Sequence, residues 1–198
     1  MLEMPILETP RLQIRPFALA DLADAYRLFD EELADADLGT VTVTARAQRA
    51  EWLQWTVLNY TQLAQLNQPP YGDRAIVLQA TGELIGSCGY VPCLNAFAQV
   101  PGMAATVEAD RVSPEFGLFY AISPTHQRRG YATEAAQAMV DYAFQHLRLR
   151  RIVAETNYDN EGSIGVMRRL GMRIGRNSLP EPPWLQVVGV IEFQAEVE

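Results

Sequence analysis

The segment from Glu115 to Leu147 constrains the fold of this chain more than any other. Residues 115–122 are apolar and aromatic with one glycine, which predicts a strand. From Ala132 to Leu147 the apolar residues recur at helical spacing and the polar residues avoid that face, which predicts an amphipathic helix. A strand that leads through a short bend into such a helix is typical of α/β folds, in which helices cover a sheet.

The rest of the chain supplies strands and helices around this segment. Strands are predicted at residues 11–15, 75–78, 84–91, 151–156 and 186–195, and helices at 19–31, 45–66 and 160–170. Residues 92–114 show no clean period and predict an irregular loop or a loop with a short extra element; a substrate lid and a plain insertion are both open. Because no repeat or linker interrupts this order, we expect a single α/β domain over residues 1–198, with a mixed sheet.

Composition and charge exclude several classes of protein. The chain has 198 residues, of which 48% are hydrophobic, and this suits one sizeable core. Its net charge of -8 and its scattered arginines argue against nucleic-acid binding. Cys88 and Cys93 are too few for a disulfide scaffold and lack metal-ligand spacing, so we expect reduced thiols and no metal site. Without a signal-peptide pattern or an apolar run near the roughly 20 residues that span a bilayer, we expect a cytoplasmic protein with no membrane partner.

The bend between the strand and the amphipathic helix favours anion binding. A helix start has unpaired backbone N–H groups and partial positive charge. Gly130 leaves room for a phosphate to approach the backbone, and Ala132 keeps the next position small. Further contacts to phosphate oxygens can come from the side chains of Arg128, Arg129 and Thr133. These residues alone leave two interpretations open, a phosphate site or a glycine-assisted helix start with solvated arginines, and they match neither the P-loop nor the Rossmann pattern.

Three segments together resemble a known family. Gln-Arg-Arg-Gly-Tyr-Ala at 127–132 matches the Gln/Arg-x-x-Gly-x-Gly/Ala signature of the GNAT superfamily of N-acetyltransferases. Gly-Tyr-Ala-Thr-Glu-Ala at 130–135 resembles the helix start of its RimJ/RimL-like ribosomal-protein alanine acetyltransferase branch. Residues 9–16 look like that branch's opening strand, and residues 160–172 look like its Asn-x-x-Ser…Leu-Gly-Phe motif. The resemblance therefore runs in the right order from residue 9 to about residue 172.

The resemblance implies a fold and a cofactor. The fold would be a mixed, mostly antiparallel sheet of about six to seven strands flanked by helices, with splayed central strands. The acyl-donor cosubstrate would be acetyl-CoA, with its pantetheine arm in the gap between those strands and its thioester oxygen held by backbone N–H groups. The residues implied to bind it are Phe119, Ala121, Ile122, Gln127, Arg128, Arg129, Gly130, Tyr131, Ala132, Thr133, Asn160 and Ser163.

The same resemblance suggests candidates for acid–base catalysis. Glu115 occupies a strand position where related enzymes often carry a glutamate, so it is either the base that deprotonates the acceptor or a solvent-exposed strand-edge residue. The tyrosine acid common in the superfamily would stand at Met167, where it is absent. Ser163 is the nearest replacement as acid, and Tyr158 is a weaker alternative. Further base candidates in the long loop are Glu108 and Asp110.

The sequence thus predicts an acetyl-CoA-dependent N-acetyltransferase that moves an acetyl group to a primary amine by direct attack, without a metal or a covalent enzyme intermediate. The acceptor could be a protein N-terminus or a small-molecule amine. A non-catalytic acyl-CoA-binding or regulatory module is the alternative, because the usual tyrosine is missing. The acceptor pocket would be shaped by residues 31–72 and 92–114, and a homodimer is open. Both pocket lining and core or dimer packing are open for Trp52, Trp55 and Trp184.

Overall fold

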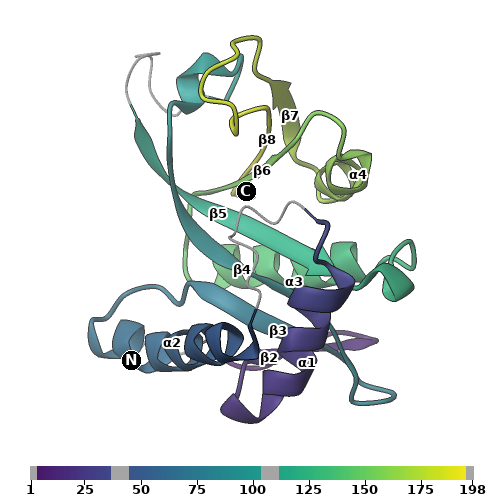
Figure 1. The fold of residues 1–198 in the computed structure, drawn as a ribbon. Helices are drawn as coiled ribbons and strands as arrows, with labels where there is room; N and C mark the ends of the chain where they lie inside the picture. Colours follow the sequence, from purple (N-terminus) through teal and green to yellow (C-terminus); the bar gives the residue numbers. More distant parts are fainter. Residues whose placement is uncertain (1–3, 37–44, 104–111, 195–198) are drawn as a thin grey trace. The chain divides into compact units, whose positions relative to one another are not determined.

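The computed structural model describes residues 4–36, 45–103 and 112–194 (Figure 1). The chain divides into two compact units. Unit 1 comprises Met1–Tyr90 with Tyr120–Ala138, and unit 2 comprises Val91–Phe119 with Met139–Glu198. The single domain expected over residues 1–198 stays a prediction.

Among the described residues, eight strands form one sheet in the order β1-β2-β3-β4-β5-β6-β8-β7. Strands β5 and β6 run parallel, whereas the pairs β1–β2, β2–β3, β3–β4, β6–β8 and β7–β8 are antiparallel. The strands are β1 (Leu7–Glu8), β2 (Leu12–Pro16), β3 (Gly72–Leu78), β4 (Leu84–Asn95), β5 (Ser113–Ile122), β6 (Arg151–Thr156), β7 (Arg173–Arg176) and β8 (Val187–Glu192). The mixed, mostly antiparallel α/β sheet is confirmed, and the strand count exceeds the expected six to seven because β1 and β7 were not predicted.

The helices follow the predicted pattern closely. The predicted helix at 19–31 is a continuous helical stretch made of a 3-10 turn, an α-helix and a π-helical segment. The helix predicted at residues 45–66 is α2, which begins at Arg46 and ends at Gln65. The helical elements are η1 (Leu19–Asp21), α1 (Leu22–Tyr26), η2 (Arg27–Glu32), α2 (Arg46–Gln65), η3 (Phe97–Gln99), η4 (Pro124–His126), α3 (Tyr131–Gln145) and α4 (Glu161–Arg169).

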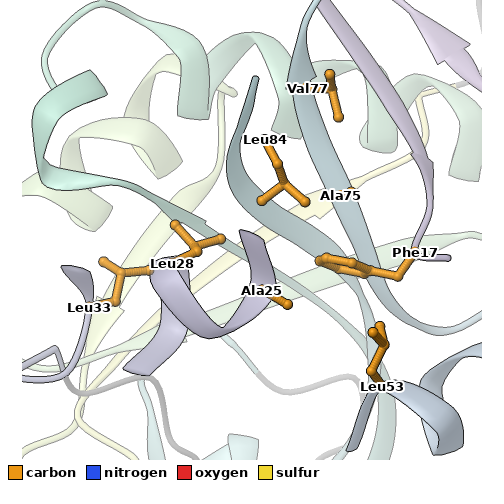
Figure 2. Packing of buried hydrophobic residues seen from close by; sticks show 8 residues of the cluster. All are labelled: Phe17, Ala25, Leu28, Leu33, Leu53, Ala75, Val77 and Leu84. Atoms are coloured by element: carbon orange, nitrogen blue, oxygen red, sulfur yellow. The ribbon is translucent and has the colours of Figure 1, made fainter. Parts of the chain in front are cut away.

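The core of unit 1 lies between β3, β4 and the helices α1 and α2 (Figure 2). Ala75 and Val77 project from one face of β3, as alternate residues of a strand do, and both belong to the same buried cluster as Phe17. The buried members of this cluster are Phe17, Ala25, Leu28, Leu33, Leu53, Ala75, Val77 and Leu84. Full burial of a large apolar side chain contributes about 1.5–3 kcal/mol, so this cluster fixes the helices on the sheet.

Arg49 of α2 connects this helix to the helical segment η2. Its guanidinium pairs with Asp30 at 2.7 Å and lies 4.7 Å from the Phe29 ring centroid and 4.8 Å from that of Trp52. Trp52 also packs edge-on against Phe17 at 5.5 Å. Of the two roles left open for this tryptophan, the structure therefore shows core packing.

Unit 2 has its own core on one face of β6 and β8. The sequence predicted an irregular loop, or a loop with a short extra element, over residues 92–114. In the structure β4 continues through Pro92 to Asn95, and the 3-10 turn η3 follows. The turn brings the fully buried Phe97 against Val153. The buried members of this core are Phe97, Val100, Met103, Val153, Leu185, Val188 and Val190. A short extra element therefore packs into the core, and residues 104–111 lie outside the described part of the chain.

Within unit 2, the parallel strands β5 and β6 share the register pair Gly117 and Val153. Both strands continue beyond this pair, β5 through Phe119 and β6 through Glu155. A Cβ atom on Gly117 would overlap the Cys93 sulfur of β4, so the chain requires glycine where the three strands meet. The pairing of the two parallel strands is thus centred on one residue of each.

Asp73 in unit 1 couples stability to pH. Its Oδ1 accepts a hydrogen bond from the Ser87 hydroxyl at 3.0 Å. Burial raises the pKa of Asp73 to about 6, although the Ser87 hydrogen bond and the charge of Arg49 oppose this rise. Between about pH 3.9 and the folded-state pKa, the folded protein holds more protons than the unfolded chain, so its stability falls as pH rises through that window.

Replacing Asp73→Asn should therefore stabilise the protein at pH 8. Asparagine keeps an acceptor for Ser87 and removes the buried charge, so we expect the free energy of unfolding to rise by about 1–3 kcal/mol at pH 8 and to change little at pH 4. Urea denaturation at both pH values measures this difference. An equal loss of stability at both pH values would contradict the assignment.

Candidate active site

The bend between β5 and α3 has the backbone form of an anion site. Arg128 and Gly130 both adopt left-handed conformations, with φ of 59° and 83°. Alternation between left-handed and other conformations turns successive N–H groups toward one side and forms a concave nest. The amide of Glu134 donates to the carbonyl of Gly130 at 3.0 Å, so the amides before it lie in the open first turn of α3. The predicted anion site is therefore a nest that leads directly into a helix N-terminus.

The arginines of this bend are available to a ligand. Arg128 and Arg129 are both exposed. In the described part of the chain, no hydrogen bond or ion pair ties either guanidinium to another residue. Two exposed cations beside a helix N-terminus give the site a positive charge, which favours a phosphate group.

Gln127 closes the bend. Its side-chain amide donates to the carbonyl of Ile122 at 3.0 Å, and the Ser123 amide donates to the carbonyl of Ile85 at 2.8 Å. The sequence assigned Gln127 to cofactor binding. Its side chain serves in this structure to hold the end of β5 against the start of the bend.

Glu134 anchors the start of α3 to the segment before β2. Its Oε1 accepts from the Thr9 hydroxyl at 2.6 Å and from the Arg11 amide at 2.9 Å, and its Oε2 accepts from the Arg11 guanidinium at 2.6 Å. Burial would raise the pKa of Glu134, but these hydrogen bonds and the Arg11 charge outweigh it, so the pKa is lowered. The carboxylate is therefore held ionised by two residues of a distant segment.

Arg11 also contacts the bend itself. One of its guanidinium nitrogens donates to the carbonyl of Arg129 at 3.0 Å, and the group lies 4.4 Å from the centroid of the Tyr131 ring. A Cβ atom on Gly130 would come within 3.4 Å of the same guanidinium. The segment at residues 9–16 and the signature at 127–132 are thus physically joined, which the sequence did not predict. The signal was present in Thr9, Arg11 and Glu134, but one sequence carries no code for pairing them.

Glu115 is enclosed and paired. Its side chain is 7% exposed, and its Oε1 lies 3.2 Å from Nε of Arg151. Burial raises the pKa of Glu115, the charge of Arg151 lowers it and that of Glu192 raises it, with a net rise. The expectation of a solvent-exposed strand-edge residue is therefore wrong. Its role as a base stays a prediction.

Asn160 and Ser163 lie at the start of α4. The Asn160 side chain is the N-cap and accepts from the Ser163 amide at 3.0 Å. Met167 is fully buried, and the Tyr158 hydroxyl donates to the carbonyl of Asn177 at 2.5 Å. The tyrosine position of the superfamily thus lies in the core here, and the substitute hydroxyl of Tyr158 is already engaged.

The predicted site residues fall in both units. Unit 1 holds Ala121, Ile122, Gln127, Arg128, Arg129, Gly130, Tyr131, Ala132 and Thr133. Unit 2 holds Glu115, Phe119, Asn160 and Ser163. The further base candidates Glu108 and Asp110 lie outside the described residues.

The thiols and the remaining acidic side chains form no metal centre in the described ranges, where no group of three or more His, Cys, Asp or Glu residues could hold an ion. Both cysteines are free thiols, and burial raises the pKa of Cys88 and of Cys93 to about 12. Over the same ranges, no helix has the length and apolar character that crossing a membrane requires.

Residues 11–173 match the family profile described as the Acetyltransferase (GNAT) domain. The chain belongs to this GNAT acetyltransferase family and is an acyltransferase. YoaA of Bacillus subtilis (strain 168), an uncharacterized N-acetyltransferase, is 31% identical over 170 residues, which are 85% of this chain and 83% of YoaA. YnaD from the same organism is 43% identical over 58 residues, and that alignment covers 29% of this chain and 34% of YnaD.

Solved structures share the fold. The acetyltransferase from Agrobacterium tumefaciens str. C58 matches 96% of this chain and 95% of its own, with a TM-score of 0.65 and 25% identity. RimL, a ribosomal L7/L12 α-N-protein acetyltransferase solved with coenzyme A, matches 93% of this chain and 94% of its own, with a TM-score of 0.63 and 14% identity. The family match confirms the resemblance to the GNAT superfamily, the solved structures share its fold, and the RimJ/RimL-like branch stays a prediction.

The contacts of Glu134 with Thr9 and Arg11 should stabilise the folded protein. Glu134→Gln keeps the shape of the side chain but removes the charge that Thr9 and Arg11 bind, so we expect a loss of about 1–3 kcal/mol in the free energy of unfolding at pH 7. Since the pKa of Glu134 is lowered, the wild-type advantage is present above the unfolded pKa and disappears as pH falls below about 4.3.

Glu161→Gln is the matched control for this measurement. Glu161 also lies in the first turn of a helix, but its side chain is 67% exposed and its ion pairs are 3.7 Å long. Exposed pairs of this kind contribute about 0–1 kcal/mol. An equal decrease in the free energy of unfolding for the two variants in urea denaturation would show that Glu134 contributes no more than an exposed ion pair.

Proposed function

We propose that this protein transfers the acetyl group of acetyl-CoA to a primary amine. The observation that carries the proposal is the nest at Arg128 and Gly130, which opens into the N-terminus of α3 and is flanked by two exposed arginines. Membership of the GNAT acetyltransferase family supports this assignment of the donor.

The proposed donor site uses backbone more than side chains. The amides of residues 128–133 would hold the pyrophosphate, and the guanidinium groups of Arg128 and Arg129 would add charge-assisted contacts. Gly130 fits this role because its missing side chain leaves the nest open. The implied acetyl-CoA contacts of Tyr131, Ala132 and Thr133 follow from their place in the first turn of α3. Asn160 and Ser163 are proposed to meet the pantetheine arm.

The transfer itself needs hydrogen-bond donors that stabilise an oxyanion, and a base that deprotonates the amine. Backbone N–H groups of Phe119, Ala121 or Ile122 would stabilise the oxyanion that forms when the amine attacks the thioester carbonyl. The ammonium loses one proton to a base, a C–N bond then forms and the C–S bond breaks, and the nitrogen loses its second proton to the thiolate or to solvent. Glu115 is the base predicted from the sequence, and the leaving thiolate departs as such or takes a proton from Ser163.

The proposed acceptor is a cationic amine, either a protein N-terminus or a small molecule. The net charge of -8 favours the approach of cations. One relative, the spermidine N(1)-acetyltransferase of Escherichia coli (strain K12), is 33% identical over 73 residues, which are 37% of this chain and 39% of that protein. The buried Met167 and the engaged Tyr158 hydroxyl favour the second candidate function, an acyl-CoA-binding module without catalysis.

Two measurements on the wild-type protein test the proposal. Calorimetry should detect binding of acetyl-CoA, and a thiol-release assay should detect turnover with at least one amine from a panel of peptides, amino acids, polyamines and aminoglycosides. Binding without thiol release across the panel would support the non-catalytic module. Absence of acetyl-CoA binding would contradict both functions.

Gly130→Glu tests the location of the donor site. The glutamate would put a negative side chain in the nest and repel the pyrophosphate, so we expect acetyl-CoA binding to weaken by at least about 100-fold, or roughly 2.7 kcal/mol. Gly82→Glu is the matched control, because Gly82 also has a positive φ, of 72°, and its hairpin turn has open space around it. Equal weakening by the two variants would place the donor elsewhere.

A further inference from the structure

One face of unit 2 carries two carboxylates with different surroundings. Side chains alternate along a strand, so Arg151, Val153 and Glu155 project from the same face of β6. Val153 packs with Cys93 of β4 on that face. Glu115 of β5 lies at the Arg151 end of this row, where the two form an ion pair. Glu155 lies at the other end, and nothing in the proposed function uses it.

Glu155 has an amide partner and no cationic one. The Asn95 side chain donates to its Oε1 at 2.8 Å and to its Oε2 at 2.9 Å. Within the described parts of the chain, no arginine, lysine or histidine forms an ion pair with it. Burial raises the pKa of Glu155, and the Asn95 hydrogen bonds oppose this rise. One Asn95 amide group thus satisfies only part of what a partly buried carboxylate can accept.

Asn95 is itself held in one orientation. The indole Nε1 of Trp184 donates to the Asn95 Oδ1 at 3.0 Å, so the amide nitrogen faces Glu155. The Trp184 side chain is 62% exposed although its polar nitrogen is committed. The exposed Trp184 ring is therefore linked through the Asn95 amide to the Glu155 carboxylate, which has no cationic partner in the described residues.

This combination matches the chemistry of an ammonium group. A partly buried carboxylate without a cation is unfavourable alone and attracts an incoming cation. An exposed indole adds a cation–π contact and an apolar surface for the carbon chain next to the ammonium.

The position of Glu155 along the sheet also suits the reaction. Strands β5 and β6 are parallel and in register at Gly117 and Val153. Phe119 and Glu155 each follow that pair by two residues, roughly 7 Å further along their strands. Phe119 is the first residue of the segment proposed to hold the thioester, so Glu155 lies level with it within unit 2.

We infer that Glu155 is the acceptor-side base, and that Asn95 and Trp184 position it to receive the ammonium of a primary amine. This inference rests on the proposed acetyl transfer. The ammonium gives one proton to the Glu155 carboxylate, and the neutral amine nitrogen then forms a bond to the thioester carbon. The C–S bond breaks with release of the thiolate, and the nitrogen loses its second proton to the thiolate or to solvent, which leaves the amide. Glu115 then serves as the ionic partner of Arg151.

Glu155→Gln tests this role. With the amine that gives the fastest thiol release, we expect kcat/KM for the amine to fall by about 100-fold or more, the size of a general-base effect, while the acetyl-CoA Kd stays within about twofold. Glu192→Gln is the control, because Glu192 lies on the neighbouring strand β8 with a half-exposed side chain. Wild-type kcat/KM in Glu155→Gln would overturn the inference.

Trp184→Ala and Asn95→Leu test the positioning residues. Both should raise KM for the amine by about 5- to 50-fold through the lost cation–π contact and carboxylate orientation, with a smaller change in kcat. Asn95→Gln retains the amide and should recover part of the loss. A fall in thermal stability with unchanged KM would show that the three residues are only structural.

If the proposed acetyl transfer fails, the ammonium site can still be tested by amine binding without acetyl-CoA. If acetyl-CoA does not bind or no amine releases thiol, the same amine panel is added to wild-type and Glu155→Gln protein without acetyl-CoA, and binding is followed by ligand-observed NMR. Amine binding that is lost in Glu155→Gln supports the ammonium site alone. No amine binding to the wild type, or equal binding to both proteins, overturns it.

Discussion

The hydrogen bonds that the Glu134 carboxylate accepts are the interaction on which the rest of the proposed donor site depends. This carboxylate receives hydrogen bonds from Thr9 and Arg11, and Arg11 continues to the carbonyl of Arg129. Left-handed backbone at a non-glycine residue such as Arg128 costs free energy and persists only where the surroundings fix it. The anchor supplies that constraint, because it ties both the bend and the first turn of α3 to the strand region at the beginning of the chain.

Charge compensation distinguishes the two carboxylates of the proposed acceptor side. Arg151 neutralises Glu115 inside unit 2, whereas Glu155 has only the amide of Asn95. Because Arg151 already compensates the charge of Glu115, we infer that Glu155, which lacks a countercharge among the described residues, is the more reactive carboxylate. The resemblance to related enzymes suggested Glu115 as a base, and the absence of an ion pair at Glu155 within the described part of the chain is the physical reason to prefer Glu155 in the proposal.

Much of the fold could be predicted from the sequence, because long amphipathic segments carry a clear period. The helix at 131–145 and the strand before it follow directly from the spacing of apolar residues. The two-residue strand β1 and the four-residue strand β7 are too short to show alternation, and they exist through pairing with β2 and β8. The strand through Pro92 was missed because proline usually interrupts a ladder, yet here it is exposed.

The proposed donor site lies in one segment of the sequence, whereas the residues that support it are spread along the chain. Gly130 and its arginines are local features of one bend, so the sequence could point to them. Glu134 looked like an ordinary polar residue on the solvent face of a helix, because its partners lie 123 and 125 residues away. The Glu155 arrangement joins side chains from β4, β6 and the segment before β8, which no spacing in the chain reveals.

Backbone amides at the start of α3 are proposed to hold the donor's phosphates. Amide hydrogen exchange, followed by mass spectrometry on peptides that cover residues 124–134, tests it most directly. Saturating acetyl-CoA should slow exchange in this segment, and free pyrophosphate at high concentration should slow it more weakly. Unchanged exchange there, together with protection elsewhere in the chain, would contradict the account.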